Sequence, residues 1–377
     1  MLILSAIVLL VWANALGRTI VNLYLIPRLD RARAATGGEL VSIVIPARDE
    51  ERVIERTVRS MLGQTYRDLE VIVVNDRSTD STGAILRSFD DPRLVVIDGE
   101  EPPPGWLGKP WALHEGSRRA RGSLLLFVDA DLRYAPETIG ALVTRRQDGG
   151  AAMTCLLPHV EMEGFWEHIA MPQLAFTAFT LLPTWLSNRT RSLALAIGGG
   201  TGNFIGRDQY DAAGGHEALK DAVVDDVGLA RLVRRHGLRS EVVRADEFVS
   251  LHMYRGAREI IEGFTKNMFA VVGRSYARAV VILAVSLFFS LGPYVMLLVP
   301  RLFWPGLASV ALLTAARVVL YRSLRYRLGN AIFGHPLMVL FWTWIFLRSI
   351  WKTGVRGQLE WRGRMYDAAQ TRFGGER

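Results

Sequence analysis

The sequence predicts an α/β domain with a mostly parallel sheet, flanked by membrane helices near both ends of the chain. Three observations lead to this prediction. Long apolar stretches without charge stand near both ends of the 377 residues. Between them, short continuous apolar runs alternate with amphipathic helical patterns, as a parallel sheet covered on both faces requires. The mean hydropathy of +0.18 is high for a soluble protein, and 22% charged residues exclude a wholly disordered one.

Residues 1–27 are predicted to form an uncleaved N-terminal anchor. Leu2 to Gly17 carries no charge, and a second uncharged stretch follows Arg18 as far as Pro27. This stretch lacks the basic start and the Ala-x-Ala cleavage site that mark a signal peptide. Three arginines follow within six residues, so the positive-inside rule places the next domain in the cytoplasm.

Residues 279–350 are predicted to form C-terminal membrane helices, after a juxtamembrane segment (251–278) and before a basic tail (351–377). The stretch 279–300 has no charge over 22 residues, enough to cross a bilayer of about 30 Å. The stretch 302–321, interrupted by Pro305 and Arg317, is expected to return to the cytoplasm. A third stretch, 328–347, either crosses or is re-entrant or interfacial. The basic tail argues against crossing.

Residues 40–250 are predicted to form the cytoplasmic domain. Its expected strands are continuous apolar runs that end in polar residues: Val41–Pro46, Leu69–Asn75, Arg93–Asp98 and Ser123–Asp129. Acidic residues followed by helically spaced apolar ones predict an amphipathic helix over 49–62. The alternation of strand and helix predicts a parallel sheet.

Residues 165–186 are strongly apolar but contain two prolines, a glutamate and a histidine. We expect an interfacial helix on the membrane surface, with Trp166 and Trp185 near its ends as the residue type that favours that interface. A fifth span and a buried core helix are the alternatives. A membrane lipid would reach the domain beside this segment and the hairpin that begins near Ala279.

Polar residues follow three expected strands, at the edge where open parallel sheets bind ligands. They are Ala47–Glu50, Asn75–Asp80 and Asp129–Asp131. Helix capping explains any one of these groups but not the convergence of all three. The Asp-x-Asp turn at a buried strand end suits a hard divalent cation bound to a diphosphate.

Two later segments complete the expected crevice. Gly198–Gly202 precedes Asn203 and indicates a loop that approaches a ligand closely. Asp225 and Asp226 begin an amphipathic helical pattern. Capping is one interpretation of Asp225, whereas Asp226 is expected to present its carboxylate to the crevice as a general base.

Several classes of protein are excluded by the sequence. The single cysteine, Cys155, rules out an intrachain disulfide and a zinc site built on cysteines. The sequence has neither a P-loop nor a GxGxxG after the first expected strand. The formal charge is +8, and many of the arginines, which make up nearly all of the 45 basic residues, flank apolar runs. This placement indicates contact with anionic lipid head groups, and no nucleic-acid partner is expected.

Six segments between Val41 and Arg235, about half of the chain, resemble the family 2 glycosyltransferases: VSIVIPARDEE, VIVVNDRSTDST, GWLGKPWALHEG, LLLFVDADL, GGGTGNFIGRDQYDAAGGH and VVDDVGLARLV. With its flanking membrane segments, the chain is most similar to the hopanoid-associated and carotenoid-acid (diaponeurosporenoate) glycosyltransferases, and more distantly to ceramide glucosyltransferases. The resemblance implies the GT-A fold, a Rossmann-like α/β domain with a mostly parallel sheet. It also implies a multi-pass protein of the cell (plasma) membrane with a cytoplasmic catalytic domain.

The resemblance implies a donor site. The donor nucleotide would be held by Pro46, Ala47, Arg48, Glu50, Asp76, Lys109 and Asp129. Asp129 and Asp131 would bind the metal, Mg²⁺ or Mn²⁺, with a UDP-sugar as donor.

It also implies an acceptor side. The sugar or acceptor would meet Gly200, Thr201, Gly202, Asn203 and Asp225, and Asp226 would be the catalytic base. The Gln-x-x-Arg-Trp box of many relatives is not present. Arg255 and Arg258, near its expected place, would bind either the diphosphate or lipid phosphates.

The sequence therefore predicts inverting, metal-dependent transfer of a hexose from a nucleotide-sugar to a membrane lipid. A polyprenyl-phosphate hexose transferase and a processive polysaccharide synthase are the alternatives, and the missing box argues against the second. From other classes, a nucleotidyltransferase would leave the Asp225-Asp226 element unexplained. An inactive membrane scaffold would not need the acidic residues of the crevice.

Overall fold

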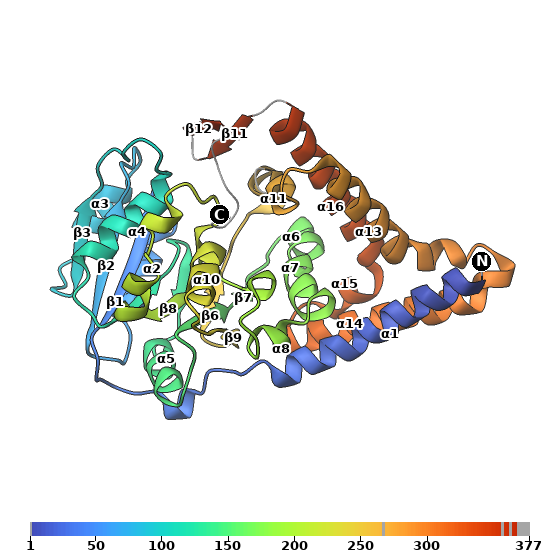
Figure 1. The fold of residues 1–377 in the computed structure, drawn as a ribbon, viewed down its shortest axis with the longest axis horizontal. Coiled ribbons are helices and arrows are strands. Elements are labelled where there is room, and N and C mark those ends of the chain that lie inside the picture. Colours follow the sequence, from blue (N-terminus) through green and yellow to red (C-terminus); the bar gives the residue numbers. More distant parts are fainter. Residues whose placement is uncertain (1, 266–267, 356–357, 362–363, 368–377) are drawn as a thin grey trace. The chain divides into compact units, whose positions relative to one another are not determined.

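The structure, a computed structural model, describes residues 2–265, 268–355, 358–361 and 364–367. The chain divides into two compact units. The α/β unit comprises residues 26–161 and 186–253. The membrane-helix unit comprises residues 2–25, 162–185 and the described residues from 254 onward (Figure 1). Each unit is described by itself.

A seven-stranded sheet forms the centre of the α/β unit, in the order β3-β2-β1-β4-β8-β6-β9. Strands β1 to β4 are parallel, β8 is antiparallel to β4 and β6, and β6 and β9 are parallel. The bounds are β1 Val41–Ala47, β2 Leu69–Asn75, β3 Leu94–Asp98, β4 Leu124–Phe127, β6 Met153–Leu157, β8 Asn203–Gly206 and β9 Ser240–Arg244. The four strands expected from the sequence are β1 to β4, and the prediction of a mostly parallel α/β sheet is confirmed.

Helices flank this sheet. They are α2 Ile54–Leu62, α3 Thr82–Arg87, α4 Gly108–Arg119, α5 Thr138–Gln147, α9 Arg207–Ala212 and α10 Asp225–Arg235, with the 3₁₀ turns η1 Arg31–Arg33, η3 Leu193–Leu195 and η4 Glu217–Leu219. Helix α2, which was predicted over residues 49–62, begins at Ile54 and not at Asp49. The reason is that Asp49 adopts a positive φ of 52°, and turns follow it before the helix starts.

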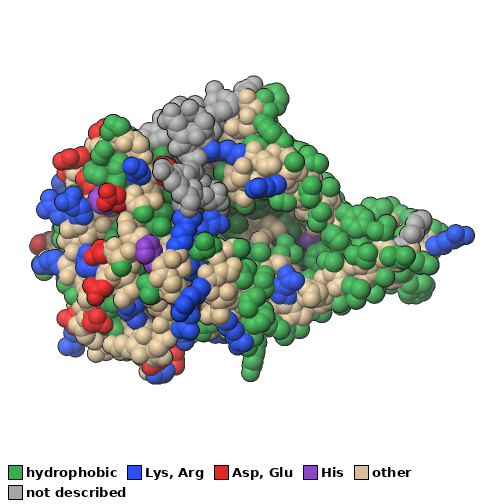
Figure 2. All heavy atoms as spheres, in the orientation of Figure 1, with side chains coloured by type: hydrophobic (Ala, Val, Ile, Leu, Met, Phe, Trp, Pro, Cys, Tyr) green, Lys and Arg blue, Asp and Glu red, His purple; other side chains and the backbone are tan. Residues whose placement is uncertain are grey.

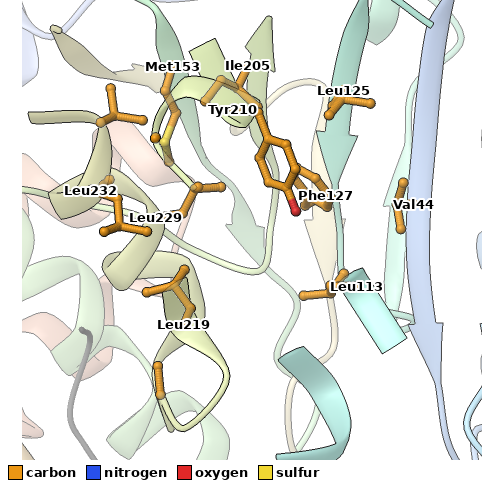
Figure 3. Packing of buried hydrophobic residues seen from close by; sticks show 14 residues of the cluster. Val44, Leu113, Leu125, Phe127, Met153, Ile205, Tyr210, Leu219, Leu229 and Leu232 are labelled. Carbon is orange, nitrogen blue, oxygen red and sulfur yellow. The ribbon is translucent and has the colours of Figure 1, made fainter. Parts of the chain in front are cut away.

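Helix α10 is fixed to the sheet by apolar packing. Figure 3 shows Leu229 and Leu232 of α10 with Met153 of β6, Ile205 of β8 and Phe127 of β4. All five side chains are buried, and burying each contributes about 1.5–3 kcal/mol. This packing fixes the position of α10 on the sheet, and with it the two adjacent aspartates in the first turn of the helix.

A three-stranded sheet adjoins the end of β4. Its order is β5 (Leu132–Tyr134), β10 (Val249–Leu251) and β7 (His159–Val160). Strand β10 is antiparallel to β5 and parallel to β7. Because β4 ends at Phe127 and β5 begins at Leu132, the turn with Asp129 and Asp131 is fixed at both ends by strands.

The membrane-helix unit contains three helices that are long and apolar enough to cross a membrane: Leu2–Leu25, Tyr276–Met296 and Pro300–Leu324. They correspond to α1, α13 and the short turn η5 (Pro300–Leu302) with α14 (Phe303–Leu324). Helices α1 and α14 run side by side (Figure 1). Hydrophobic side chains cover these helices on the face that Figure 2 shows, as expected for surfaces that meet lipid.

The third apolar C-terminal stretch divides at Gly334 into α15 (Leu328–Phe333) and α16 (His335–Ser349). Neither helix is among the three candidate spans, and a crossing segment and a re-entrant or interfacial one both stay open for this stretch. The unit also contains α11 Gly256–Thr265, α12 Met268–Val271, the π-helical turn η6 Ile350–Val355 and the hairpin β11 Gln358–Trp361 with β12 Arg364–Asp367. The other residues of the predicted basic tail, 356–357, 362–363 and 368–377, lie outside the described residues.

Residues 165–186 form several short helices instead of one. They are α6 Phe165–Ala170, α7 Pro172–Phe176, the π-helical turn η2 Thr177–Leu181 and α8 Thr184–Ser187. Phe176 and Phe179 are buried in the membrane-helix unit, and Phe176 packs against Trp12 of α1. The location of this segment at a membrane surface stays a prediction.

The polar residues of α1 find partners in that segment. Asn22 Nδ2 donates to the carbonyl oxygens of Phe179 (2.7 Å) and Leu182 (2.8 Å), and its Oδ1 accepts from the Trp185 N–H at 2.8 Å. Thr19 Oγ1 contacts Thr180 Oγ1 at 2.9 Å. Because unsatisfied polar groups are costly in lipid, these bonds explain how a helix with internal polar residues can remain apolar on its outer surface.

Candidate active site

Two loops at the carboxyl ends of β1 and β2 are joined by reciprocal hydrogen bonds. The Asp49 N–H donates to Ser78 Oγ at 3.0 Å, and the Thr79 N–H donates to Asp49 Oδ1 at 2.7 Å. The Glu51 N–H donates in the same way to Asp80 Oδ2 at 3.0 Å. Side chains of each loop therefore satisfy the backbone of the other.

Asp76 lies at the centre of these loops and is 4% exposed. Its Oδ2 is 3.6 Å from Arg48 Nη1, and its Oδ1 is 3.5 Å from Arg77 Nε. The Asp76 N–H donates to the Ala47 carbonyl at 2.8 Å. The residues predicted on the nucleotide side lie together at this edge of the sheet: Pro46, Ala47, Arg48, Glu50 and Asp76.

A pocket next to the end of β4 brings together residues from widely separated segments of the chain. Its charged and polar lining comes from α4, the turn after β4, the loop Gly198–Gly202 (the glycine loop), the start of β8, the loop before α10 and α10 itself. The lining residues are Lys109, Leu113, Phe127, Val128, Asp129, Gly200, Asn203, His216, Asp225 and Asp226. Six residues predicted from separate motifs therefore line one pocket.

Lys109 is the cation of this pocket. Its Nζ lies 2.7 Å from Asp129 Oδ1 and 3.5 Å from Asp225 Oδ1. Burial alone would lower the pKa of Lys109, but the carboxylates of Asp129, Asp225 and Asp226 outweigh burial and raise that pKa well above its usual value. Lys109 is therefore a permanent positive charge between carboxylates.

The glycine loop approaches two of these carboxylates with no room for side chains. The Asp129 N–H donates to the Gly200 carbonyl at 2.7 Å, and Asn203 Nδ2 donates to the Asp226 carbonyl at 3.2 Å. A Cβ at Gly200 would overlap the Asp129 carboxylate, and one at Gly198 would overlap the Asp226 backbone. Glycine is required at both positions for this reason.

The rest of the loop is held from behind. Thr201 Oγ1 donates to the Leu156 carbonyl at 2.6 Å, and the Thr201 carbonyl accepts from the Tyr134 hydroxyl at 2.7 Å. Gly202 adopts a φ of 146°, and a Cβ there would lie 2.5 Å from the Tyr134 oxygen. Thr201 and Gly202, both predicted at the acceptor side, therefore support the loop from below the pocket lining.

Asp225 and Asp226 have different surroundings in the first turn of α10. Asp225 is 4% exposed, whereas Asp226 is half-buried and accepts the Val227 N–H on its Oδ1 at 2.7 Å. Burial raises the pKa of Asp225 to about 7 against the opposing attraction of Lys109. Of the two, Asp226 is the carboxylate that a substrate in the pocket can reach more easily.

His216 belongs to the pocket lining but was not predicted as a site residue. It is 1% exposed, and its Nε2 lies 3.9 Å from Asp225 Oδ2. Burial and the nearby Lys109 lower the pKa of His216 to about 3, so it is neutral. A lone histidine after two glycines carried no signal of this role in the sequence.

Two carboxylates at the end of β4 could serve as ligands for a divalent cation. Asp129 offers a 41% exposed carboxylate to the pocket, cradled by Gly200, and Asp131 is half-buried two residues later. Within the described ranges, no three His, Cys, Asp or Glu side chains are grouped to hold a metal. Magnesium typically takes one or two carboxylates with substrate phosphates, so the residues fit a cation that binds together with a diphosphate.

Arg255 and Arg258 belong to the membrane-helix unit. Arg255 Nη1 lies 3.7 Å from Glu163 Oε2, and Arg258 Nε lies 3.0 Å from Glu262 Oε1. Their binding of a diphosphate or of lipid phosphates stays a prediction.

The comparisons with known proteins agree with this geometry. Residues 42–210 match the model of "Glycosyl transferase family 2". The chain carries a family 2 glycosyltransferase domain. The matched residues include β1 to β8, the Asp129–Asp131 turn and the glycine loop, whereas His216 and the Asp225–Asp226 pair follow them.

Among curated proteins, the glycosyltransferase is similar to the 4,4'-diaponeurosporenoate glycosyltransferase of Staphylococcus aureus (strain MRSA252). The two are 26% identical over 340 residues, which cover 88% of this chain and 89% of the relative. Among solved structures, it is similar to the mannosyltransferase PcManGT of Pyrobaculum calidifontis, solved in complex with GDP-Man and Mn²⁺. That likeness has a TM-score of 0.51 at 20% identity and covers 93% of this chain and 99% of the other. It confirms the GT-A fold of the glycosyltransferase domain.

Proposed function

We propose that the glycosyltransferase moves a hexosyl group, with inversion, from a UDP-hexose to a lipid of the membrane that its own helices occupy. The observation that carries the proposal is the pocket in which Lys109, Asp129, Asp225 and Asp226 meet at the carboxyl end of β4. One cation and three carboxylates at this edge supply both a base and a site for a charged leaving group.

The base of the reaction is assigned to Asp226. An acceptor hydroxyl attacks the anomeric carbon, its proton passes to the Asp226 carboxylate, and the bond from the anomeric carbon to the donor phosphate breaks. The half-buried position of Asp226 in the pocket lining supports this role. Its carboxylate is held in place by the Val227 N–H, which keeps it oriented for proton transfer.

The leaving nucleoside diphosphate gains negative charge as that bond breaks. Lys109 is the resident cation of the pocket and offsets part of this charge. A Mg²⁺ or Mn²⁺ ion on Asp129 and Asp131 would supply further positive charge when bound. The nucleotide itself would lie against the joined loops of β1 and β2, where Asp76 and Arg48 are already paired.

The lipid acceptor is supported by two facts. Three helices of the chain are long and apolar enough to cross a membrane. The curated relative that matches most of the chain is named for a carotenoid-acid acceptor. A lipid that carries a hydroxyl or a carboxylate fits both facts.

Mass spectrometry of lipid extracts tests the proposal. Lipids are extracted from cells that make the unchanged chain and from cells that make the Asp226→Asn variant, and the two extracts are compared. We expect hexosylated lipids only with the unchanged chain. A product confined to polyprenyl phosphate, a soluble polysaccharide, or no product with any nucleotide-sugar would overturn the proposed acceptor or the proposed activity.

A further inference from the structure

A buried line of polar side chains leads from the interior of the domain to the pocket, and the proposed chemistry leaves three of them unused: Ser117, Tyr210 and His216. The Tyr210 hydroxyl is 2.7 Å from His216 Nδ1 and 3.2 Å from Ser117 Oγ. The next contact is His216 Nε2 with Asp225 Oδ2 at 3.9 Å, and Asp225 Oδ1 is 3.5 Å from Lys109 Nζ. The line therefore runs from the interior of the domain to the pocket cation.

The hydrogen bonds around the Tyr210 hydroxyl bear on which nitrogen of the His216 ring carries the proton. Ser117 donates its hydroxyl proton to the His114 carbonyl at 2.8 Å, and the Tyr210 oxygen accepts the backbone N–H of His216 at 3.0 Å. The Tyr210 hydroxyl has one proton and two possible acceptors, Ser117 Oγ at 3.2 Å and His216 Nδ1 at 2.7 Å, and we assign the proton to the shorter contact. Donation to Nδ1 leaves the ring proton on Nε2, so the ring directs an N–H toward the Asp225 carboxylate.

The ring cannot turn away from this arrangement. His216 is 1% exposed, and its ring packs edge-on against Phe127 with centroids 4.7 Å apart. The ring also contacts that of Tyr210, with centroids 5.6 Å apart, and both Phe127 and Tyr210 belong to the apolar cluster between α10 and the sheet (Figure 3). An imidazole in such surroundings is costly unless its nitrogen atoms find partners.

The charges around His216 make it a neutral dipole and not a cation. Lys109 and His114 both disfavour its protonation, as burial does. Asp225 faces its Nε2, and Asp225 in turn faces Lys109, Asp226 and Asp129. The contact of 3.9 Å is longer than a direct hydrogen bond, so the N–H dipole orients the carboxylate without sharing a proton with it.

We propose that His216, held by the Tyr210 hydroxyl, is a positioning residue that fixes the Asp225 carboxylate against Lys109 for sugar transfer. The proposal rests on the proposed function of the pocket. Fixing Asp225 keeps one carboxylate on each side of Lys109, which leaves Asp226 available to the acceptor. A role in packing alone would be met by phenylalanine, which also has a flat aromatic ring and needs no polar partners.

A double-mutant cycle tests whether His216 acts through Asp225. The variants His216→Phe, Asp225→Asn and their combination are made in the full chain, and transfer from a UDP-hexose to extracted lipid is measured. We expect His216→Phe to lower kcat about tenfold, with the donor KM changed by less than about twofold. In the Asp225→Asn background the same change should cost less than about twofold, a coupling within the range seen for residues in contact.

Two conservative variants separate the two nitrogen atoms of the ring. The amide nitrogen of Gln can take the place of Nε2, and that of Asn can take the place of Nδ1. We therefore expect His216→Gln to recover more kcat than His216→Asn, because only Gln keeps a donor aimed at Asp225.

Tyr210→Phe has a matched control in Tyr66→Phe. Tyr66 is also buried in the α/β unit, and its hydroxyl donates to the Glu39 carbonyl at 2.7 Å, away from the pocket. Both changes remove one bonded hydroxyl and should lower the melting temperature similarly. Only Tyr210→Phe should lower kcat, about threefold or more.

The outcomes distinguish this inference from the proposed function. If the unchanged chain transfers no sugar from any nucleotide-sugar, the proposed function fails. The positioning role fails alone if the unchanged chain is active and His216→Phe keeps full kcat. It also fails if the losses from His216→Phe and Asp225→Asn multiply independently.

Discussion

Replacing Lys109 by methionine isolates the electrostatic role of the pocket cation, because methionine keeps an unbranched chain of similar length. Its Nζ lies 2.7 Å from Asp129 and 3.5 Å from Asp225. With an effective dielectric constant of about 20, these contacts correspond to gross attractions of about 6 and 5 kcal/mol. Desolvation of the charges offsets much of this, and removal of one member of a buried pair typically costs about 3–5 kcal/mol.

The lower end of that range applies here, because Asp129 is 41% exposed and water can screen its charge. We expect Lys109→Met to destabilise the α/β unit by about 3 kcal/mol at pH 8. For a domain of 150–250 residues this lowers the melting temperature by about 6–12 °C. The loss should be smaller at pH 5.5, where Asp225 is protonated and the carboxylates repel one another less.

Differential scanning fluorimetry of the full chain in detergent measures this effect at both pH values. Lys220→Met is the control, because Lys220 is exposed and in the same region of the fold. A loss for Lys109→Met that equals that of the control, or that grows at pH 5.5, would refute the assignment of Lys109 as the cation between carboxylates.

Three further predictions concern the same pocket. Transfer by the unchanged chain should require added Mg²⁺ or Mn²⁺, and Asp131→Asn should abolish that transfer. Turnover that survives excess chelator would contradict a metal role. Burial raises the pKa of Asp225 from 3.8 to about 7. The folded state thus retains a proton that the unfolded chain releases, and stability should fall as the pH rises from about 4 to about 7. Denaturation midpoints of Asp225→Asn across that window should lack this fall. Gly200→Ala should lower kcat about 100-fold, because its Cβ displaces the Asp129 carboxylate. Gly199→Ala should retain most activity in the same assay, because its Cβ would lie 3.2 Å from the Thr201 hydroxyl and at ordinary contact distance, 3.7 Å, from Cys155 Sγ.

The first four strands could be predicted because their apolar runs are continuous and end in polar residues. Strand β9 could not, since it contains Glu241, which is only 4% exposed. Arg145 from α5 pairs with this carboxylate at 2.7 Å, and Thr154 of β6 donates to it at 3.1 Å. Local sequence shows a glutamate in a short mixed segment, and the partners that make it a core residue lie about 90 positions away.

The carboxylates of the pocket could be predicted because, unlike Glu241, they stand at the ends of elements that the local sequence indicates. Asp129 follows a buried strand and Asp225 begins a helix, so local pattern places both at element ends. His216 gave no such signal, because its position depends on the turn at Gly214 and Gly215, which have positive φ values of 86° and 52°. That turn brings His216 back onto Tyr210, which no periodicity in the sequence indicates.

The reciprocal bonding of the β1 and β2 loops has a consequence for altering donor choice. Asp49 and Glu51 of one loop complete the backbone of the other, and Ser78 and Asp80 do the reverse. Their conformation is established before any nucleotide arrives, so binding there escapes the cost of about 0.5–1.5 kcal/mol for each side chain that would otherwise be immobilised. Grafting a single loop from a relative with a different nucleotide preference would leave several backbone donors of its neighbour unpaired. The two loops therefore depend on each other structurally, and a change of nucleotide specificity at this edge requires that both be exchanged together.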